Sequence, residues 1–310
     1  MKIGVYAYGP GMGLGKGLDD LTERFAKLDA DGFHTAWAAN PGQIDQFTLM
    51  SLMGRVTTRM ELGTAVLRTY PYHPLAMAQH ALTAQAASNN RFILGVGPAN
   101  RSYVEDVLGI TFKPIRHMME YLTILNGLFS GEMVDFKGQE YHLKAKVQIN
   151  GANKPLVILS ALGPQMLRLA GRMADGTITW MGGPKYLETM AIPIIYKGAE
   201  ASGRPTPRII VSNPICVTNA FDSARESANR YFGHYGKIPS YRALLDIEGV
   251  SDASAVAIVG DEAQVERQLR HLASIGVTDL NASPYPVKED PEARERTYRF
   301  LSDLAKAGGI

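Results

Sequence analysis

The sequence has little cysteine, little net charge and no long apolar run. Cys216 is its only cysteine in 310 residues, so no intrachain disulfide is possible, which suits a reducing cytoplasm. The 32 basic and 30 acidic side chains give a net charge of +2, too balanced to indicate nucleic acid or an anionic membrane as a partner. No stretch is apolar enough to span a membrane, and a strand pattern starts directly at Met1–Tyr6, without a signal peptide. We therefore expect a cytoplasmic protein.

Motifs of several enzyme classes are also missing. The glycine-rich segment 9–17 differs from a phosphate loop, because Pro10 replaces its first glycine and Gly17 replaces the Ser or Thr that would hold a metal. Asn100 replaces the third glycine of a dinucleotide-binding motif after Gly95 and Gly97. No cluster of His, Cys, Asp and Glu has metal-ligand spacing, and no G-x-S-x-G motif is present. Nothing here predicts a metal site or a hydrolase.

The most informative stretch is Ser160–Trp180, which follows the apolar run Leu156–Leu159. Gly163 and Pro164 break that run, and proline fits the first position of a helix. Apolar residues then recur at helical spacing until a second strand at Thr177–Trp180. Strand, turn, helix and strand form a βαβ unit with parallel strands. The free N–H groups at the start of its helix predict a phosphate site.

The same alternation runs along the whole chain. Strands are predicted at 2–8, 33–38, 60–67, 92–96, 156–159, 177–180, 208–217 and 277–282. Helices are predicted to begin at Leu18, Ile44, Pro74, Ile115, Pro164, Leu187, Asp222 (to about Tyr235), Asp261 and Pro291. This count predicts a single (β/α)8 TIM barrel over residues 1–310, with a doubly wound sheet as the alternative. Two inserts are expected, a hairpin at about 131–153 and an irregular segment at about 236–258.

In such a barrel the active site lies at the C-terminal ends of the strands. The residues predicted there are aromatic, small or amide-bearing, and few are acidic. They are Trp37, Asn40, Thr64, Ala65, Val66, Arg68, Tyr70, Tyr72, His73, Gly97, Pro98, Asn100, Arg101, Ser160, Ala161, Leu162, Gly163 and Trp180. This composition suits a flat ring stacked over the barrel mouth, and it does not suit a hydrolytic acid/base pair.

Several of these residues also have a purely structural interpretation. Trp37 and Trp180 can be packing residues, and His73 can cap the helix that begins at Pro74. Outside the set, His117 is predicted at the surface, and Met118, Met119 and Cys216 in the core. The methionines Met50 and Met53 can belong to the core or to an interface.

Short blocks along most of the chain resemble the luciferase-like oxidoreductases that use coenzyme F420, a deazaflavin. The blocks are Gly32-Phe-His-Thr-Ala-Trp37, Leu62-Gly-Thr-Ala-Val66, His73-Pro, Arg91-Phe-x-Leu-Gly-Val-Gly97, Phe129-x-Gly-Glu-x-Val134, Ala161-Leu-Gly-Pro-x-Met-Leu-Arg-Leu-Ala-Gly and Ala174-Asp-Gly-Thr-x-Thr-Trp180. The order and spacing of the blocks carry the resemblance. It implies a (β/α)8 fold like that of bacterial luciferase, coenzyme F420, hydride transfer to or from a small molecule, and a homodimer.

The resemblance also assigns residues. Relatives have a bulge with a non-proline cis peptide behind the deazaflavin, which would fall at Ala65–Val66. The cofactor would be bordered by Trp37, Asn40, Thr64, Gly97, Pro98, Asn100 and Trp180, with its phosphate and tail at Ser160, Ala161, Leu162 and Gly163.

Two departures from the family pattern bear on the reaction. Asn40 and Pro98 stand where sugar-phosphate dehydrogenases of the family have His and Glu, and neither can take a proton from an alcohol. Reduction of an activated double bond is therefore favoured, with Asn40 orienting substrate or ring. Tyr8, Tyr70, Tyr72 and His73 are proton-donor candidates by position. The alternatives are an FMN-dependent luciferase-like monooxygenase and a barrel that binds the cofactor without catalysis.

Overall fold

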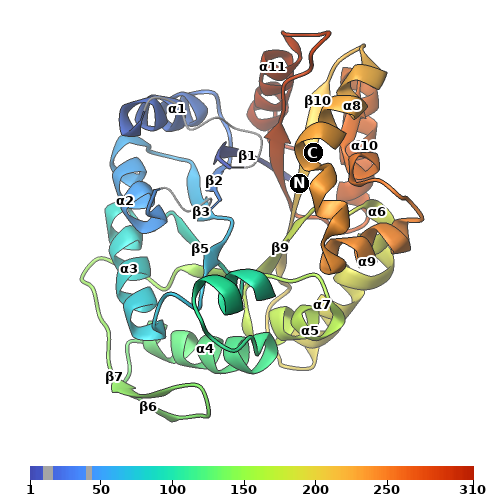
Figure 1. Cartoon of the computed structure of the whole chain (residues 1–310). Coiled ribbons are helices and arrows are strands. Elements are labelled where there is room, and N and C mark those ends of the chain that lie inside the picture. The colour runs from blue at the N-terminus through green and yellow to red at the C-terminus, as the bar shows by residue number, and fades with distance from the viewer. Residues whose placement is uncertain (10–16, 40–43) are drawn as a thin grey trace.

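The computed structural model describes residues 1–9, 17–39 and 44–310. Eight strand positions close into a parallel barrel, because β1 pairs with both β2 and β12, and β9 pairs with β10 (Figure 1). In order around the barrel the strands are β1 (Lys2–Tyr8), β2 (Thr35–Ala38), β3 (Glu61–Thr64) continued by β4 (Leu67–Arg68), β5 (Phe92–Gly97), β8 (Leu156–Ser160), β9 (Gly176–Trp180), β10 (Arg208–Val217) and β12 (Asp279–Pro284). The short β11 (Ile258–Gly260) extends the sheet beside β10. The (β/α)8 prediction is confirmed.

Helices surround the strands, as Figure 1 shows. They are α1 (Leu18–Ala30), α2 (Gln46–Val56), α3 (Pro74–Ala87), α4 (Pro114–Phe129), α5 (Pro164–Met173), α6 (Pro184–Tyr186), α7 (Ile192–Glu200), α8 (Phe221–Phe232), α9 (Pro239–Glu248), α10 (Glu262–Ser274) and α11 (Ala293–Lys306). The predicted start of α10 is a capping box, in which the Asp261 carboxylate accepts from the Gln264 N–H at 2.8 Å.

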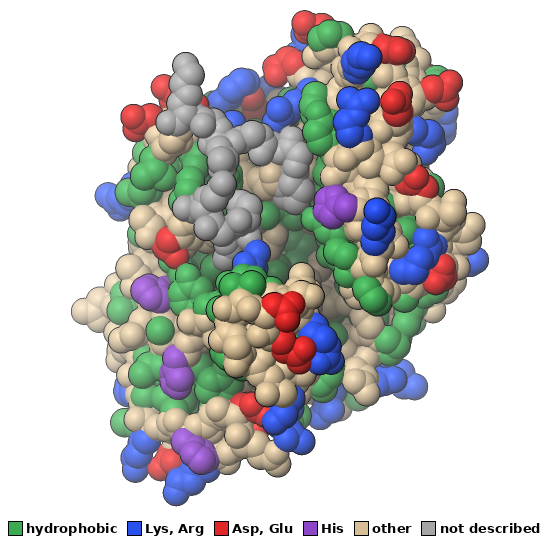
Figure 2. All heavy atoms as spheres, in the orientation of Figure 1, with side chains coloured by type: hydrophobic (Ala, Val, Ile, Leu, Met, Phe, Trp, Pro, Cys, Tyr) green, Lys and Arg blue, Asp and Glu red, His purple; other side chains and the backbone are tan. Residues whose placement is uncertain are grey.

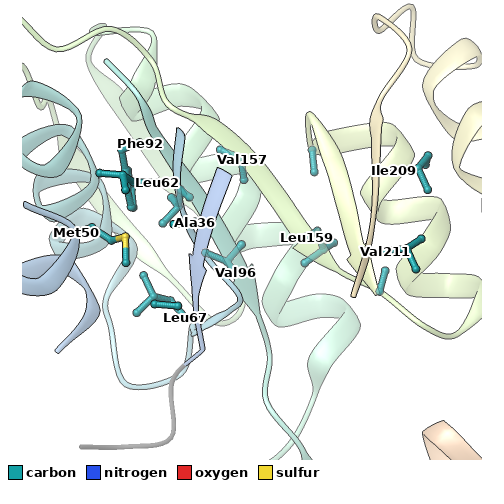
Figure 3. Close-up of a cluster of buried hydrophobic side chains, with 14 of the residues drawn as sticks. Ala36, Met50, Leu62, Leu67, Phe92, Val96, Val157, Leu159, Ile209 and Val211 are labelled. Carbon is teal, nitrogen blue, oxygen red and sulfur yellow. The ribbon is translucent and has the colours of Figure 1, made fainter. Parts of the chain in front are cut away.

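The main core lies between the strands and the helices. Leu62 and Phe92 point outward from neighbouring strands into the same cluster as Met50 of α2 (Figure 3). All three are almost completely buried, and so is Met53. The methionines of α2 therefore belong to the core, whereas Leu52 on the same helix is exposed.

The β8–α5–β9 unit forms as the sequence predicts. Pro164 stands in the first turn of α5, and β8 pairs in parallel with β9. Asp175, between α5 and β9, accepts from the Val157 N–H at 2.9 Å and from Arg204 at 2.8 Å. These bonds tie the end of the helix to the start of the preceding strand, which leaves the other end of the unit at the barrel mouth.

The strand predicted at 60–67 is interrupted. The peptide between Ala65 and Val66 is cis, at the position that the resemblance implied, and it separates β3 from β4. Thr64 spans the interruption, since its hydroxyl donates to the Gly95 carbonyl at 2.8 Å and accepts from the Gly95 N–H at 2.9 Å. Both strands thereby stay aligned with β5.

An ion cluster closes the N-terminal end of the barrel. Arg208 at the start of β10 forms ion pairs with Asp279 of β12 and, at 2.9 Å, with Glu61 of β3. Because β3 and β10 stand on opposite sides of the closed sheet, these bonds cross the bottom of the barrel. Lys2 adds an ion pair to Glu61 at 3.1 Å.

Two predicted helices have different boundaries. α8 begins at Phe221 with Ala220 as its N-cap, so Asp222 lies in the first turn and not at the cap. The helix ends at Phe232, and residues Gly233–Lys237 form a 3-10 turn instead of continuing the helix to Tyr235. The helix predicted at 187–201 is a composite: the π-helical turn Leu187–Ala191 precedes α7, whose Pro193 lacks the N–H that a continuous α-helix would use.

The hairpin predicted within 131–153 is present as the antiparallel pair β6 (Val134–Lys137) and β7 (His142–Ala145). The segment 236–258 is not irregular, which corrects the prediction. It contains α9, opened by Pro239 and closed by Gly249 in the left-handed conformation (φ 77°), and a 3-10 turn at Ala253–Val256.

Two predictions about helix α4 are wrong. His117 is buried, because its ring stacks on Tyr70 at 3.8 Å and its Nε2 lies 2.7 Å from the Thr69 hydroxyl. Met119 is 47% exposed, since it faces away from the barrel, while the adjacent Met118 is in the core as predicted. Cys216 is also buried, as predicted.

Candidate active site at the barrel mouth

A cavity of about 460 Å³ opens at the C-terminal ends of the barrel strands. Figure 2 shows the molecule hollowed in the middle of this face, between hydrophobic side chains. Its lining residues are Tyr6, Gly9, Ala39, Ala65, Val66, Arg68, Ser160, Ile178, Thr179, Trp180, Tyr231, Phe232, His234, Tyr235 and Tyr241. Both the volume and the mainly apolar lining are typical of a small-molecule site.

One side of the cavity is made by the interrupted strand. Ala65 and Val66 line it together with Ser160 from the end of β8. Gly97 stands behind them: a Cβ atom there would lie 3.0 Å from the Val66 Cγ2 and 3.2 Å from the Ser160 Cβ. A side chain at position 97 would therefore press on Val66 and Ser160 and shift them by a few tenths of an ångström.

The opposite side is an aromatic wall, here defined as Trp180, Phe232, Tyr235 and Tyr241. Tyr235 packs edge-on against Trp180 at 5.7 Å and against Tyr241 at 5.0 Å between ring centroids. Phe232 meets Trp180 in the same way at 5.7 Å. Such edge-to-face contacts fix the ring planes and stabilise the wall beyond simple burial. The wall joins the end of β9 to the end of α8, the 3-10 turn after it and the start of α9.

Three of the four tyrosines that line this cavity have a raised pKa and are protonated at neutral pH. Burial raises the pKa of Tyr6, an effect that hydrogen bonds to Ser212 and Asn281 oppose. Burial likewise raises the pKa of Tyr235 and of Tyr241. A phenol whose pKa is raised in this way keeps its proton at neutral pH, so it can donate a hydrogen bond and does not act as a base.

The start of α5 lies next to the cavity wall formed by Ser160. Gly163 is its N-cap and supplies no side-chain cap, and a Cβ atom at this position would meet nothing within 4 Å. The loop before it is held because Tyr186 donates its hydroxyl hydrogen to the Leu162 carbonyl at 2.7 Å. The predicted phosphate position is thus an uncapped helix N-terminus beside open space.

The structure brings only part of the predicted site together. Ala65, Val66, Ser160 and Trp180 line the cavity. Ala161 and Trp37 are buried next to it, and Trp37 packs its ring against Gly63. Asn40 lies outside the described residues.

Tyr70, His73 and Asn100 are not among the described lining residues. The His73 ring accepts from the Leu75 N–H at 3.2 Å and so caps α3, as in its structural interpretation. The Tyr70 hydroxyl accepts from the Lys113 N–H at 3.0 Å, and the Asn100 side chain accepts from the Tyr103 N–H at 2.8 Å. Tyr70 and Asn100 therefore hold the segment that follows β5.

Sequence reasoning missed the residues that approach from a distance in the chain. Tyr6 comes from β1, and the wall residues Phe232, Tyr235 and Tyr241 come from 232–241. The insert at 236–258 was expected to shape the substrate pocket, but none of its residues was assigned a role, and of the wall residues only Tyr241 lies within it. Within the described part of the chain, no group of three His, Cys, Asp or Glu side chains could hold a metal ion, and no helix is long and apolar enough to cross a membrane.

A parallel (β/α)8 barrel with an aromatic cavity at its strand ends is typical of enzymes that bind small molecules. The luciferase-like monooxygenase family profile matches residues 1–279, so the chain belongs to this family. Some of its relatives are named as F420-dependent enzymes, and the chain is an enzyme of this superfamily.

One relative is the F420-dependent glucose-6-phosphate dehydrogenase of Nakamurella multipartita. It is 29% identical over 265 residues, which cover 82% of this chain and 72% of the relative. Among solved structures, the coenzyme F420-dependent tetrahydromethanopterin reductase of Methanopyrus kandleri has a TM-score of 0.76 at 18% identity, with 100% and 99% of the two chains covered. A type II Baeyer-Villiger monooxygenase of Pseudomonas putida, in complex with FMN, has a TM-score of 0.78 at 15% identity, with 100% and 99% covered. These two structures establish similarity of fold.

Proposed function

We propose that this protein uses coenzyme F420 to reduce an activated carbon–carbon double bond in a small organic substrate. The observation that carries the proposal is the cavity itself, in which the Ala65–Val66 wall faces an aromatic wall across a space of about 460 Å³. A flat ring fits between two such surfaces. The relatives that are named F420-dependent add support, since they match the sequence over most of its length.

The residues present fit a deazaflavin with a phosphate-bearing tail. Ala65 and Val66 would back the ring, with Gly97 and Pro98 at its border. Ser160, Ala161, Leu162 and Gly163 would hold the phosphate end, because the α5 N-terminus beside them carries no side-chain cap. When bound, this cofactor supplies a hydride at C5 of its ring.

The protein's own part is to bind, orient and protonate the substrate. No Asp or Glu is among the described residues that line the cavity, so the lining offers no carboxylate base for oxidising an alcohol. Tyr235 is better placed as proton donor than Tyr70 or His73, because it lines the cavity. Its Oη would give a proton to the carbon or oxygen that becomes basic during reduction.

An FMN-dependent monooxygenase is the second candidate, because the fold is equally close to that of an FMN-bound monooxygenase. Titration of the purified protein with oxidised F420, and separately with FMN, distinguishes the two by the change in cofactor fluorescence. We expect saturable binding of F420 in the low micromolar range and none of FMN. Preference for FMN, together with oxygen consumption on adding reduced FMN, contradicts the proposal.

Turnover is the next test. We expect conjugated enones or unsaturated acids to oxidise reduced F420. We expect no reduction of oxidised F420 when it is mixed with sugar phosphates. Tight F420 binding without turnover of any compound indicates the non-catalytic barrel instead. We also propose that the protein acts as a cytoplasmic homodimer. Measurement of its mass in solution tests the dimer, which should have twice the 33.8 kDa of one chain.

A further inference from the structure

We infer that the Tyr6 hydroxyl donates the hydrogen bond that holds a carbonyl oxygen of the substrate, and that Ser212 and Asn281 are positioning residues that direct this bond into the cavity. The substrate is then an α,β-unsaturated carbonyl compound. This inference rests on the proposed function, because it names the chemical group that activates the double bond in the same cavity.

Tyr6 is the part of the cavity lining that comes from β1. It is 3% exposed, and its ring is fixed from two sides. The ring meets Trp180 edge-on, with 6.0 Å between the centroids. On its other side the chain passes so close that a Cβ atom at Gly9 would lie 2.7 Å from the Tyr6 Cδ1. The hydroxyl oxygen therefore has a fixed position before a ligand binds, and little side-chain freedom is lost on binding.

The Tyr6 oxygen is bonded to two side chains from neighbouring strands. In the barrel β12 lies between β1 and β10, and Ser212 of β10 pairs in register with Asn281 of β12. The Asn281 Nδ2 donates to the Ser212 Oγ at 2.9 Å. Both side chains also form hydrogen bonds with Tyr6 that favour its charged form, so the Tyr6 oxygen is the acceptor in both.

The direction of these bonds leaves the hydrogen of the Tyr6 hydroxyl for a ligand. A serine hydroxyl has one hydrogen, and since the Ser212 oxygen accepts from Asn281, this hydrogen is the one that goes to Tyr6. The Asn281 amide uses its N–H groups as donors, and its Oδ1 has no partner among the described residues. Asn281, Ser212 and Tyr6 thus form a chain of donors that ends at the cavity, and each bond polarises the next donor.

A carbonyl oxygen is the acceptor that suits this donor. In the proposed reaction the β-carbon of the substrate gains a hydride as reduced F420 is oxidised, and the electron pair of the double bond moves to the carbonyl oxygen. The α-carbon then gains the proton of Tyr235, and a saturated carbonyl compound results. Because the oxygen becomes negative on the way, a hydrogen bond to it is stronger in the transition state than in the ground state. No Asp or Glu among the described lining residues competes for the Tyr6 hydrogen.

The test uses 4-dimethylaminocinnamaldehyde, an α,β-unsaturated aldehyde whose visible absorption moves to longer wavelength when its carbonyl oxygen accepts a hydrogen bond. Titration of the purified protein without cofactor measures the dissociation constant and the absorption maximum of the bound probe. We expect the wild type to bind it about three- to tenfold more tightly than Tyr6→Phe, and to shift its absorption to longer wavelength. The wavelength decides: equal maxima in the two proteins, or no binding to the wild type, overturn the inference.

Ser212→Ala tests the positioning role, because it keeps the Tyr6 hydroxyl and removes one donor to it. The bound probe should then absorb between the wavelengths seen with the wild type and with Tyr6→Phe. A melting curve checks that each variant folds. If Tyr6→Phe does not fold, Ser212→Ala decides in its place, and a maximum equal to that of the wild type overturns the inference.

Other tyrosines provide the controls. Tyr196 of α7 donates to the Gly276 carbonyl at 3.3 Å and is not among the described lining residues, so Tyr196→Phe should leave the wavelength unchanged. An equal change with Tyr196→Phe and with Tyr6→Phe would reflect the loss of any phenol and overturns the inference. Tyr235→Phe and Tyr241→Phe should each change the wavelength less than Tyr6→Phe, and a larger change with either places the carbonyl oxygen at that residue instead.

F420 titration of Tyr6→Phe separates this inference from the proposed function. If the variant loses F420 affinity and leaves the wavelength of the bound probe unchanged, Tyr6 serves the cofactor. The inference is then wrong and the proposed function stands. If the wild-type protein fails to bind F420 but shifts the probe through Tyr6, the proposed function fails and the carbonyl site stands.

Discussion

The two ends of the barrel have opposite chemistry. At the N-terminal end, Arg208, Glu61, Asp279 and Lys2 form ion pairs that cross the barrel and leave it closed. At the C-terminal end, aromatic rings surround an open cavity whose described lining contains a single permanent charge, Arg68. The charges at the bottom pair with one another across the barrel, while the described lining of the mouth is mainly aromatic and apolar. The bottom therefore supports stability, and the mouth supports binding.

The largest effect expected from this comparison is at the bottom. Arg208→Met leaves Glu61 and the almost completely buried Asp279 without their shared partner, so we expect a loss of about 3–5 kcal/mol in the free energy of unfolding. Urea denaturation measures it. F420 affinity of the folded variant should stay within about twofold of wild type. A large loss of affinity with little loss of stability would contradict the division between the two ends.

The bottom also predicts an acid dependence. Burial raises the pKa of Glu61, but hydrogen bonds and charge from Arg208 outweigh it and hold this pKa below the ordinary value of 4.5. Because the folded pKa is lowered, the stabilisation is present above pH 4.5 and is lost as pH falls through the folded pKa. In Glu61→Gln the free energy of unfolding should therefore depend less on pH below 4.5. If the free energy of unfolding of the variant depends on pH below 4.5 as strongly as that of the wild type, the Glu61 carboxylate is not the cause of this dependence.

The contribution of His117 to stability shows how far the stabilising part of the molecule extends toward the mouth. Burial lowers its pKa to about 4, an effect that the Glu120 charge opposes. The unfolded state takes up a proton near pH 6.5 and the folded state only near pH 4, so stability is full above pH 6.5 and falls between the two values, by about 3 kcal/mol. Urea denaturation at several pH values should show this decline, and His117→Gln should flatten it. The exposed His271→Gln is the matched control and should leave the decline unchanged.

At the mouth, Tyr235→Phe should lower kcat about a hundredfold with an enone that the wild type reduces, while KM changes little. The reason is that the variant keeps the aromatic ring and loses the proton. Steady-state kinetics with reduced F420 measure it, with Tyr70→Phe as the matched control, because Tyr70 is not among the described lining residues. If Tyr70→Phe is the slower variant, the proton donor has been misassigned.

The smallest effect is expected at Gly97. In Gly97→Ala the new Cβ would lie 3.0 Å from the Val66 Cγ2, and moving Val66 should weaken F420 binding about tenfold. Fluorescence titration measures the affinity, and a melting curve checks that the fold is intact. Unchanged affinity would mean that Val66 does not back the cofactor.

Much of the fold could be predicted from the sequence because its signals are local. Apolar runs that alternate with segments of helical periodicity predicted the eight strands and the helices of the barrel. Pro164 and Asp261 marked helix starts that the structure contains. The position of the cis peptide came from resemblance alone. The wall residues Tyr235 and Tyr241 could not be placed, because the turn and helix that carry them reach the cavity through long-range packing. For the same reason His117 was misplaced: Tyr141, which lies between β6 and β7 and not in α4, helps to cover it, with its hydroxyl 3.3 Å from the His117 Nδ1.

The distribution of tryptophan has a practical consequence. The chain has two tryptophans, Trp37, fully buried beside Gly63 in the barrel, and Trp180, in the wall of the cavity. The fluorescence of Trp37 should therefore stay constant when a ligand binds, whereas the fluorescence of Trp180 should change. Trp180 is thus an intrinsic fluorescent probe of the cavity. The difference in fluorescence between the wild type and the Trp180→Phe variant reports ligand binding without an attached dye.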